Sequence, residues 1–152
     1  MPDIGIVWDA ARGRGDWARG DEVPSGADDG TGGDLTAAVL VSLFTDRRAT
    51  DDFVLTDGTT NRRGWWGDTF EDEPIGSRLW QLERSKRSTA VLLAARDYCT
   101  DALRWLLRDG VVSKVDVQTF WAGRAALGIL IAIRQADGPG AVIETRLPWE
   151  TA

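Results

Sequence analysis

The 152-residue sequence contains no histidine, one cysteine and no long hydrophobic run. The absence of histidine excludes imidazole zinc sites and every Ser-His or Cys-His catalytic pair. A single cysteine, Cys99, excludes an intrachain disulfide and a multi-cysteine metal site, so we expect no metal and no cofactor. No apolar run reaches the roughly 20 residues of a membrane-spanning helix, and the N-terminus lacks the features of a signal peptide. We therefore expect a chain that is made in the cytoplasm and does not enter a membrane.

The charged and aromatic residues favour protein partners over nucleic acid. The net charge is -6 and the pI is about 4.7, which disfavours binding to nucleic acid or to anionic lipid. Arginine outnumbers lysine 16 to 2, a bias that a GC-rich genome explains as well as bidentate protein contacts do. Eight tryptophans is a high count for this length, and Trp and Arg are typical of buried interface centres.

The composition divides the chain into residues 1–34 and residues 35–152. The first part holds eight glycines and eight acidic residues against three arginines. Within it, residues 4–8 are typical of a short strand, residues 13–16 of a turn, and Trp17 of the start of a return strand. We therefore predict an N-terminal β-hairpin and a loop, followed by one larger domain.

The larger domain begins with helical patterns. Asp34 is a good N-cap for a helix that continues to Thr45 with apolar residues at helical spacing. A short helix is expected from Ser77 through Leu82. The clearest pattern predicts a long helix that Ser88 caps, that ends near Arg108 and that Gly110 stops.

The pattern then changes to the alternation of strands. Residues 115–119, 127–133 and 141–147 predict three strands, and residues 137–140 predict a turn between the last two. Residues 127–133 are apolar on both faces, which favours a central or covered strand. The fold class is therefore α+β, with an N-terminal β-hairpin, about three helices and a C-terminal three-stranded antiparallel sheet.

Few residues have the spacing of a catalytic or metal site. Glu71, Asp72 and Glu73 could supply the acid and base of a hydrolase, but a solvated acidic turn explains them better, because no apolar pocket is evident around them. Residues 28–34 resemble a calcium loop in composition and lack its ligand spacing. Cys99 falls in the predicted long helix, where a buried and unreactive thiol is expected.

Two other features can bind protein. The basic clusters at residues 47–48, 62–63 and 84–87 are either a solvated face or a docking surface, and the solvated face is favoured. An outer strand at residues 141–147, with Glu144 and Arg146 on one face, would present unpaired backbone groups at its edge. Such an edge is either covered by the chain itself or free to accept a strand from another chain.

Three segments of the polar middle resemble a known family. Ser42-Leu43-Phe44-Thr45-Asp46-Arg47-Arg48-Ala49, Arg62-Arg63-Gly64-Trp65-Trp66-Gly67-Asp68 and Ile75-Gly76-Ser77-Arg78-Leu79-Trp80 are similar in order and spacing to the Mu-type baseplate protein of contractile phage tails. The long helix and alternating strands after them also fit. The resemblance covers about residues 4–147.

That family is similar in turn to the wider baseplate wedge and sheath-initiator proteins. Their helix ends in Leu-x-Thr and a Pro-x-x-Gly-Ser motif comes after it, and this chain has Leu43-Phe44-Thr45 and Pro74-Ile75-Gly76-Ser77 there, with one residue fewer between Pro and Gly. The wider family places Glu-Pro-Arg after its long helix, whereas this chain has Arg108-Asp109-Gly110. Any contact that the Glu-Pro-Arg triplet makes in the wider family is therefore not expected in this chain. Some members bear a lysozyme label, which is not transferred either.

The resemblance implies a structural, non-enzymatic part of the virion tail baseplate, assembled in the host cytoplasm. Its role would be to join the inner wedge and hub to the first ring of sheath subunits. The implied partners are a larger baseplate wedge protein, the tail sheath protein and central hub or spike proteins, with several copies of the chain per baseplate by symmetry and neither nucleic acid nor membrane. The interface residues are expected from the basic clusters, the aromatic stretch at residues 65–70, the Gly-Ser-Arg-Leu-Trp segment at residues 76–80 and the last strand. They are Arg47, Arg48, Arg63, Trp65, Trp66, Arg78, Trp80, Val142, Ile143, Glu144, Thr145 and Arg146.

Two alternatives stay open. A tail-associated peptidoglycan hydrolase would use Glu71 or Glu73, and a free-standing adaptor would have the same fold without entering a virion.

Overall fold

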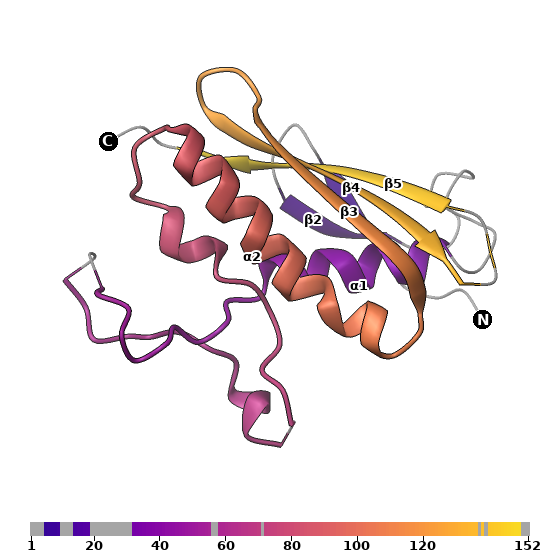
Figure 1. The fold of residues 1–152 in the computed structure, drawn as a ribbon, viewed down its shortest axis with the longest axis horizontal. Coiled ribbons are helices and arrows are strands. Elements are labelled where there is room, and N and C mark those ends of the chain that lie inside the picture. The colour runs from indigo at the N-terminus through magenta and orange to yellow at the C-terminus, as the bar shows by residue number, and fades with distance from the viewer. Residues whose placement is uncertain are drawn as a thin grey trace.

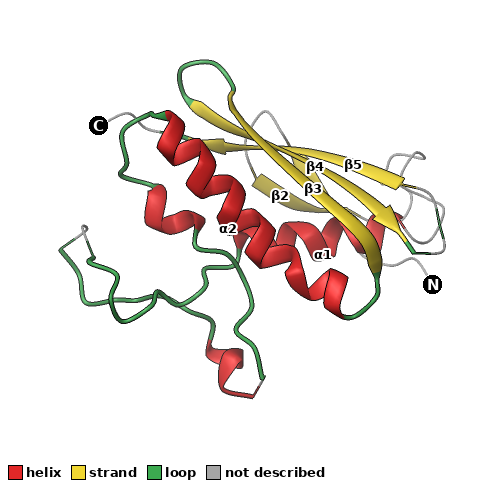
Figure 2. Cartoon of the chain, viewed as in Figure 1, coloured by secondary structure: helices red, strands yellow, loops and turns green. Residues whose placement is uncertain are grey.

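The computed structural model describes residues 5–9, 14–18, 32–55, 58–70, 72–136, 138 and 140–149. These residues form an α+β fold of two α-helices, two short 3-10 helices and five strands, as Figures 1 and 2 show. The elements in chain order are β1 (Gly5–Asp9), β2 (Arg14–Ala18), α1 (Gly32–Phe44), η1 (Trp66–Phe70), η2 (Leu79–Leu82), α2 (Thr89–Arg108), β3 (Val112–Trp121), β4 (Ala126–Gln135) and β5 (Gly140–Pro148).

The C-terminal strands form the predicted three-stranded antiparallel sheet. Its order is β3-β4-β5, so β4 is the central strand, as its apolar sequence indicated. Ile129 pairs with Thr119 on one side and with Thr145 on the other. β4 and β5 pair without a shift of register, whereas the β3–β4 ladder is irregular between Val112 and Lys114.

Helix α2 lies across one face of this sheet (Figure 1). It begins where it was predicted, since the Ser88 hydroxyl accepts a hydrogen bond from the Val91 N–H. It ends at Arg108, and Gly110 lies just beyond with φ 72°, a conformation that glycine adopts at low cost. Its buried residues recur at helical spacing and form one stripe: Val91, Ala95, Cys99, Ala102, Leu103 and Leu106.

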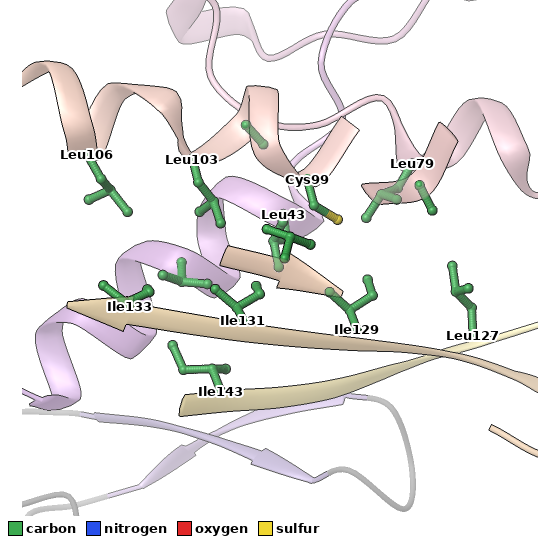
Figure 3. Close-up of a cluster of buried hydrophobic side chains, with 14 of the residues drawn as sticks. Leu43, Leu79, Cys99, Leu103, Leu106, Leu127, Ile129, Ile131, Ile133 and Ile143 are labelled. Carbon is green, nitrogen blue, oxygen red and sulfur yellow. The ribbon is translucent and has the colours of Figure 1, made fainter. Parts of the chain in front are cut away.

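The core lies between the two helices and the inner face of the sheet. In Figure 3 the side chains of Cys99, Leu103 and Leu106 from α2 point toward those of Ile129, Ile131 and Ile133 from β4. Helix α1 adds residues at helical spacing, namely Leu35, Val39 and Leu43, all 5% exposed or less. Burial of this apolar surface is the main force that holds the layers together.

Two polar contacts connect the layers. The Trp105 indole N–H donates to Ser42 Oγ (2.9 Å), which connects α2 to α1. The Thr119 hydroxyl donates to the Leu92 carbonyl (2.7 Å), which connects β3 to α2. Each contact gives a partner to a polar group that lies partly out of water.

The outer face of the sheet is only partly covered. Gly128 is buried because the Phe120 ring lies where a Cβ would stand, 2.3 Å from the nearest ring carbon. Along the same face of β4, Leu130 is half-buried, and Ala132 and Arg134 are exposed. The apolar sequence of β4 therefore reflects its central position more than burial of both faces.

Three details of the sequence prediction need correction. The short helix expected from Ser77 is a single 3-10 turn, η2. Helix α1 begins at Gly32, so Asp34 lies inside the helix and not at its cap. The turn predicted at residues 13–16 is wrong, because strand β2 begins at Arg14.

The N-terminal hairpin stays a prediction. β1 and β2 pair antiparallel, from Gly5 opposite Ala18 to Asp9 opposite Arg14. The residues that connect them lie outside the described part of the chain, so the turn that would make them a hairpin is not seen. The predicted turn at residues 137–140 also lies partly outside it.

A cavity at the helix–sheet contact should destabilise the fold. Leu103 is fully buried, so we expect Leu103→Ala to lower the free energy of unfolding by about 2–5 kcal/mol, measured by chemical denaturation. Leu107→Ala is the matched control, because Leu107 is 41% exposed on the same helix. Equal losses for the two variants would contradict the assigned core face.

The Cys99 thiol should be unreactive in the folded protein. The side chain is fully buried, and loss of solvation raises its pKa to about 12, so the nucleophilic thiolate is scarce at pH 8. We expect no reaction with Ellman's reagent at pH 8 until denaturant is added, and then one thiol per chain. Rapid labelling of the folded chain would show that α2 opens or packs differently.

Candidate protein-binding surfaces

The long segment between α1 and α2 closes on itself through a backbone bridge between Asp46 and Ser77. The Arg47 N–H donates to the Ser77 carbonyl and the Ser77 N–H donates to the Thr45 carbonyl, both at 2.9 Å. The Ser77 hydroxyl donates to the Leu43 carbonyl at the end of α1 (2.5 Å). This buried bridge brings the two ends of the polar middle segment together.

Gly76 permits this close approach. Its φ is 101°, and a Cβ at this position would lie 2.3 Å from the Thr45 carbonyl oxygen. Any other residue would force the two strands of the bridge apart. The Gly-Ser pair of the sequence motif therefore has a structural reason.

Arg63 connects three parts of the segment. Its guanidinium pairs with Asp46 (2.9 Å) and Glu83 (3.3 Å) and lies 4.7 Å from the centre of a Trp80 ring. Partial burial opposes the charged form, but the hydrogen bonds to Asp46 and Glu83 outweigh it and raise the pKa of Arg63. Its backbone has φ 52°, and the Asn61 side chain accepts a hydrogen bond from its N–H (2.8 Å).

The Trp80 side chain is buried. It is 7% exposed, its indole N–H donates to the Arg47 carbonyl (2.8 Å), and the Phe53 ring meets it edge-on at 6.1 Å between centroids. Trp80 and Arg63, both expected at an interface, thus hold the segment together from within.

Trp65, Trp66 and Phe70 form an exposed cluster, here called the aromatic turn. Trp66 is 77% exposed and Phe70 80%, with Trp65 at 41%. The Trp66 ring lies 5.3 Å from Trp65 and 6.4 Å from Phe70 between centroids. Sequence reasoning placed the two tryptophans at an interface and missed Phe70, although all three stand in one aromatic stretch of the sequence.

Asp68 holds the aromatic turn in shape. One carboxylate oxygen accepts the Trp65 N–H (3.3 Å), and the other accepts the Ile75 N–H (2.9 Å). These bonds connect the start of η1 to the segment that leads into the bridge. The three rings are therefore presented by a fixed backbone.

The remaining arginines differ in their surroundings. Arg62, which was not among the expected interface residues, donates to the carbonyls of Thr50, Asp51 and Phe53 and so shapes the loop before it. Arg48 is exposed, and Arg47 and Arg78 are half-buried. Arg47 and Arg78 line a groove beside α2.

Strand β5 has one paired and one unpaired edge in the described part of the chain. The Trp149 N–H donates to the Ala125 carbonyl (2.8 Å), and this contact continues the register of β5 with β4. Antiparallel pairing alternates, so odd-numbered residues of β5 bond to β4 and even-numbered ones point their N–H and C=O outward. Pro148 fits this assignment, because it has no N–H to offer to a ladder.

The side chains of β5 show the same alternation. Ile143 and Thr145 are buried against the core, while Val142, Glu144 and Arg146 are exposed on the outer face. Glu144 and Arg146 lie close enough to pair (3.5 Å). Five β5 residues were expected at an interface. Of these, Val142, Glu144 and Arg146 have exposed side chains and also point their backbone N–H and C=O groups away from β4.

The acidic residues considered for catalysis do not form a site in the described part of the chain. Asp72 and Glu73 are exposed, and Glu73 pairs with Arg108 of α2 (2.5 Å). Glu71 lies outside the described residues, as do residues 28–31. Among the residues that the structure describes, no group of three acidic or cysteine side chains could hold a metal ion, and no helix could cross a membrane.

Comparisons with known proteins point to one family. The family model for phage protein GP46 matches residues 35–140. The chain is 45% identical over 138 residues to "Baseplate protein gp46" of Escherichia phage Mu, covering 91% of this chain and 90% of the relative. It is 38% identical over 150 residues to "Mu-like prophage FluMu protein gp46" of Haemophilus influenzae, covering 98% of each. The chain therefore belongs to the gp46 family of Mu-type phage baseplate proteins.

Proposed function

We propose that this chain is a structural subunit of a contractile phage tail baseplate and joins the inner wedge and hub to the first ring of sheath subunits. Its membership of the gp46 family supports the baseplate assignment. The observation that carries the joining role is that a folded chain with a filled core still presents two surfaces suited to protein partners. These are the aromatic turn and the edge of β5 that no described strand pairs with.

The aromatic turn suits contact with the larger wedge protein. Trp66 is 77% exposed and Phe70 80%, an arrangement that costs free energy unless a partner covers them. Because Asp68 fixes the backbone, little conformational entropy is lost on docking. Rigid aromatic side chains of this kind dominate the binding energy of many interfaces.

The edge of β5 suits contact with a strand of the sheath protein. Strand addition uses main-chain hydrogen bonds and requires an edge without obstruction. The ladder of β4 and β5 is regular, whereas β3 carries an irregularity near Val112 that blunts the opposite edge of the sheet. The continuous main-chain bonds of an added strand would persist while the sheath contracts and rotates.

No specific observation favours the hydrolase. Glu73 lies exposed on the surface and pairs with the Arg108 guanidinium. The phage Mu relative is named as a baseplate protein.

Removal of a ring from the aromatic turn should weaken assembly and leave the fold intact. We expect Trp66→Ala to reduce binding to the co-expressed wedge protein by about 2 kcal/mol, measured by affinity purification and titration. Since Trp66 is 77% exposed, the free energy of unfolding should change little. Leu93→Ala, an exposed apolar residue on α2, is the control and should assemble normally. Normal assembly of Trp66→Ala with a loss of monomer stability would refute the proposed contact.

A proline at an outward-facing position should block the edge of β5. Glu144→Pro removes an N–H that points away from β4, so we expect a folded chain that no longer supports sheath polymerisation. Glu144→Thr is the matched control, because it removes the carboxylate and keeps the N–H. Proline at Ile143 would be less informative, since that residue is buried and its N–H faces β4. Sheath assembly at the normal rate on folded Glu144→Pro would exclude strand addition at this edge.

A further inference from the structure

A groove of about 360 Å³ lies between helix α2 and the segment that leads into the backbone bridge. Trp105 and Ala102 of α2 line one side, and Pro74, Ile75 and Gly76 line the other. The Trp105 ring is fixed, because its indole N–H donates to Ser42 Oγ. On the segment side, the residues that line the groove begin three positions after Phe70, the last residue of the aromatic turn.

Most charged groups along the groove already have partners. Asp101 pairs with Arg104 (2.6 Å), and Glu73 pairs with Arg108. Among the described residues, no carboxylate lies within ion-pair distance of Arg47 or Arg78. Asp52 feels the positive charge of Arg78, but the two do not form an ion pair.

The Nε atom of Arg78 is enclosed by the chain itself. It is buried and makes no hydrogen bond with any described residue. A ligand in the groove therefore cannot bond to Nε, and only the two terminal nitrogens of the Arg78 guanidinium are available to it.

The backbone holds both arginines in place. The Arg47 N–H and carbonyl are each bonded, to the Ser77 carbonyl and the Trp80 indole. Arg78 comes directly after Ser77, so both side chains leave the same rigid bridge. Two arginines that line one groove together with Trp105 suit a carboxylate, because a guanidinium can donate two parallel N–H bonds to it.

We propose that this groove binds an acidic peptide segment of a neighbouring baseplate protein, with a carboxylate held by Arg47 and Arg78 and an apolar flanking side chain against Trp105. The proposal rests on the proposed function, because it names the chemistry of a partner in the same assembly. Charge complementarity selects this occupant, since the two groove-lining charges that have no ion-pair partner among the described residues are both positive.

The direct test uses the full chain and a defined probe. A peptide acetyl-Gly-Leu-Asp-Leu-Glu-Gly-amide is titrated into 15N-labelled protein, with its Asn and Gln counterpart as the neutral peptide. We expect the Arg78 Nε–H resonance to shift with the acidic peptide alone. Arg47→Gln and Arg78→Gln should each weaken binding by about tenfold or more, and Arg78→Lys should weaken it less.

Arg124→Gln is the matched control, because Arg124 lies in the exposed β3–β4 loop away from the groove. Unfolding curves of all variants check that the fold is retained. Equal binding of the neutral peptide, or an equal loss with Arg124→Gln, would overturn the proposal. If Asp28→Asn and Asp29→Asn move the Arg78 resonance without any peptide, the occupant is the N-terminal part of this chain, and the partner assignment is wrong.

Assembly separates this proposal from the proposed function. The wild-type chain, Arg47→Gln and Arg78→Gln are each co-expressed with the neighbouring baseplate proteins. The affinity of each chain for those proteins is then compared in the purified complexes. If wild type and both variants enter the complex equally, the groove proposal fails and the baseplate role stands. If wild type enters no complex yet binds the acidic peptide as described, the baseplate role fails and the groove stands as a carboxylate site.

Discussion

The backbone bridge between Asp46 and Ser77 fixes the conformation of the polar segment between α1 and α2. It joins the end of α1 to the start of η2 and so closes the long segment between them, which has an entropic cost. Gly76 makes the approach possible, and Arg63 and Trp80 then fix the residues around it. The aromatic turn and the groove both depend on this bridge, because both are built from residues of the segment that it closes and from the bridge itself.

The helices and the sheet could be predicted because their signals are local. The stripe from Val91 to Leu106 repeats at 3.6 residues, β3 and β5 alternate with a two-residue period, and β4 is a short continuous apolar run, so none of these signals needs knowledge of distant contacts. The predicted start of α1 was three residues too late, since Asp34 as the cap would make Leu35 the first helical residue and the helix begins at Gly32. The short helix after Ser77 was overestimated because a capping residue does not set the length of the helix that it caps.

The site residues were predictable by type and not by role. Trp66 and Trp80 have the same chemistry in the sequence, yet one is exposed and the other buried. The difference between them is the partner of each ring, which for Trp80 is Arg63 from a distant part of the chain. Arginine is equally ambiguous, because its planar group serves internal ion pairs and external contacts alike. The outward direction of the Glu144 N–H was likewise beyond the sequence, since it depends on the register with β4.

The two proposed surfaces would bind their partners through different physical interactions. A cluster of aromatic rings binds through shape and apolar area, so it is specific and sensitive to substitution. An added strand binds through main-chain groups that every sequence supplies, so its strength depends on register and an open edge. In this chain the aromatic turn lies in the segment between α1 and α2, and the β5 edge lies on the sheet. The core formed by α1, α2 and β4 lies between them. Force applied at the β5 edge would therefore pass through closely packed apolar residues, which have low compressibility and transmit strain, before it reached the aromatic turn.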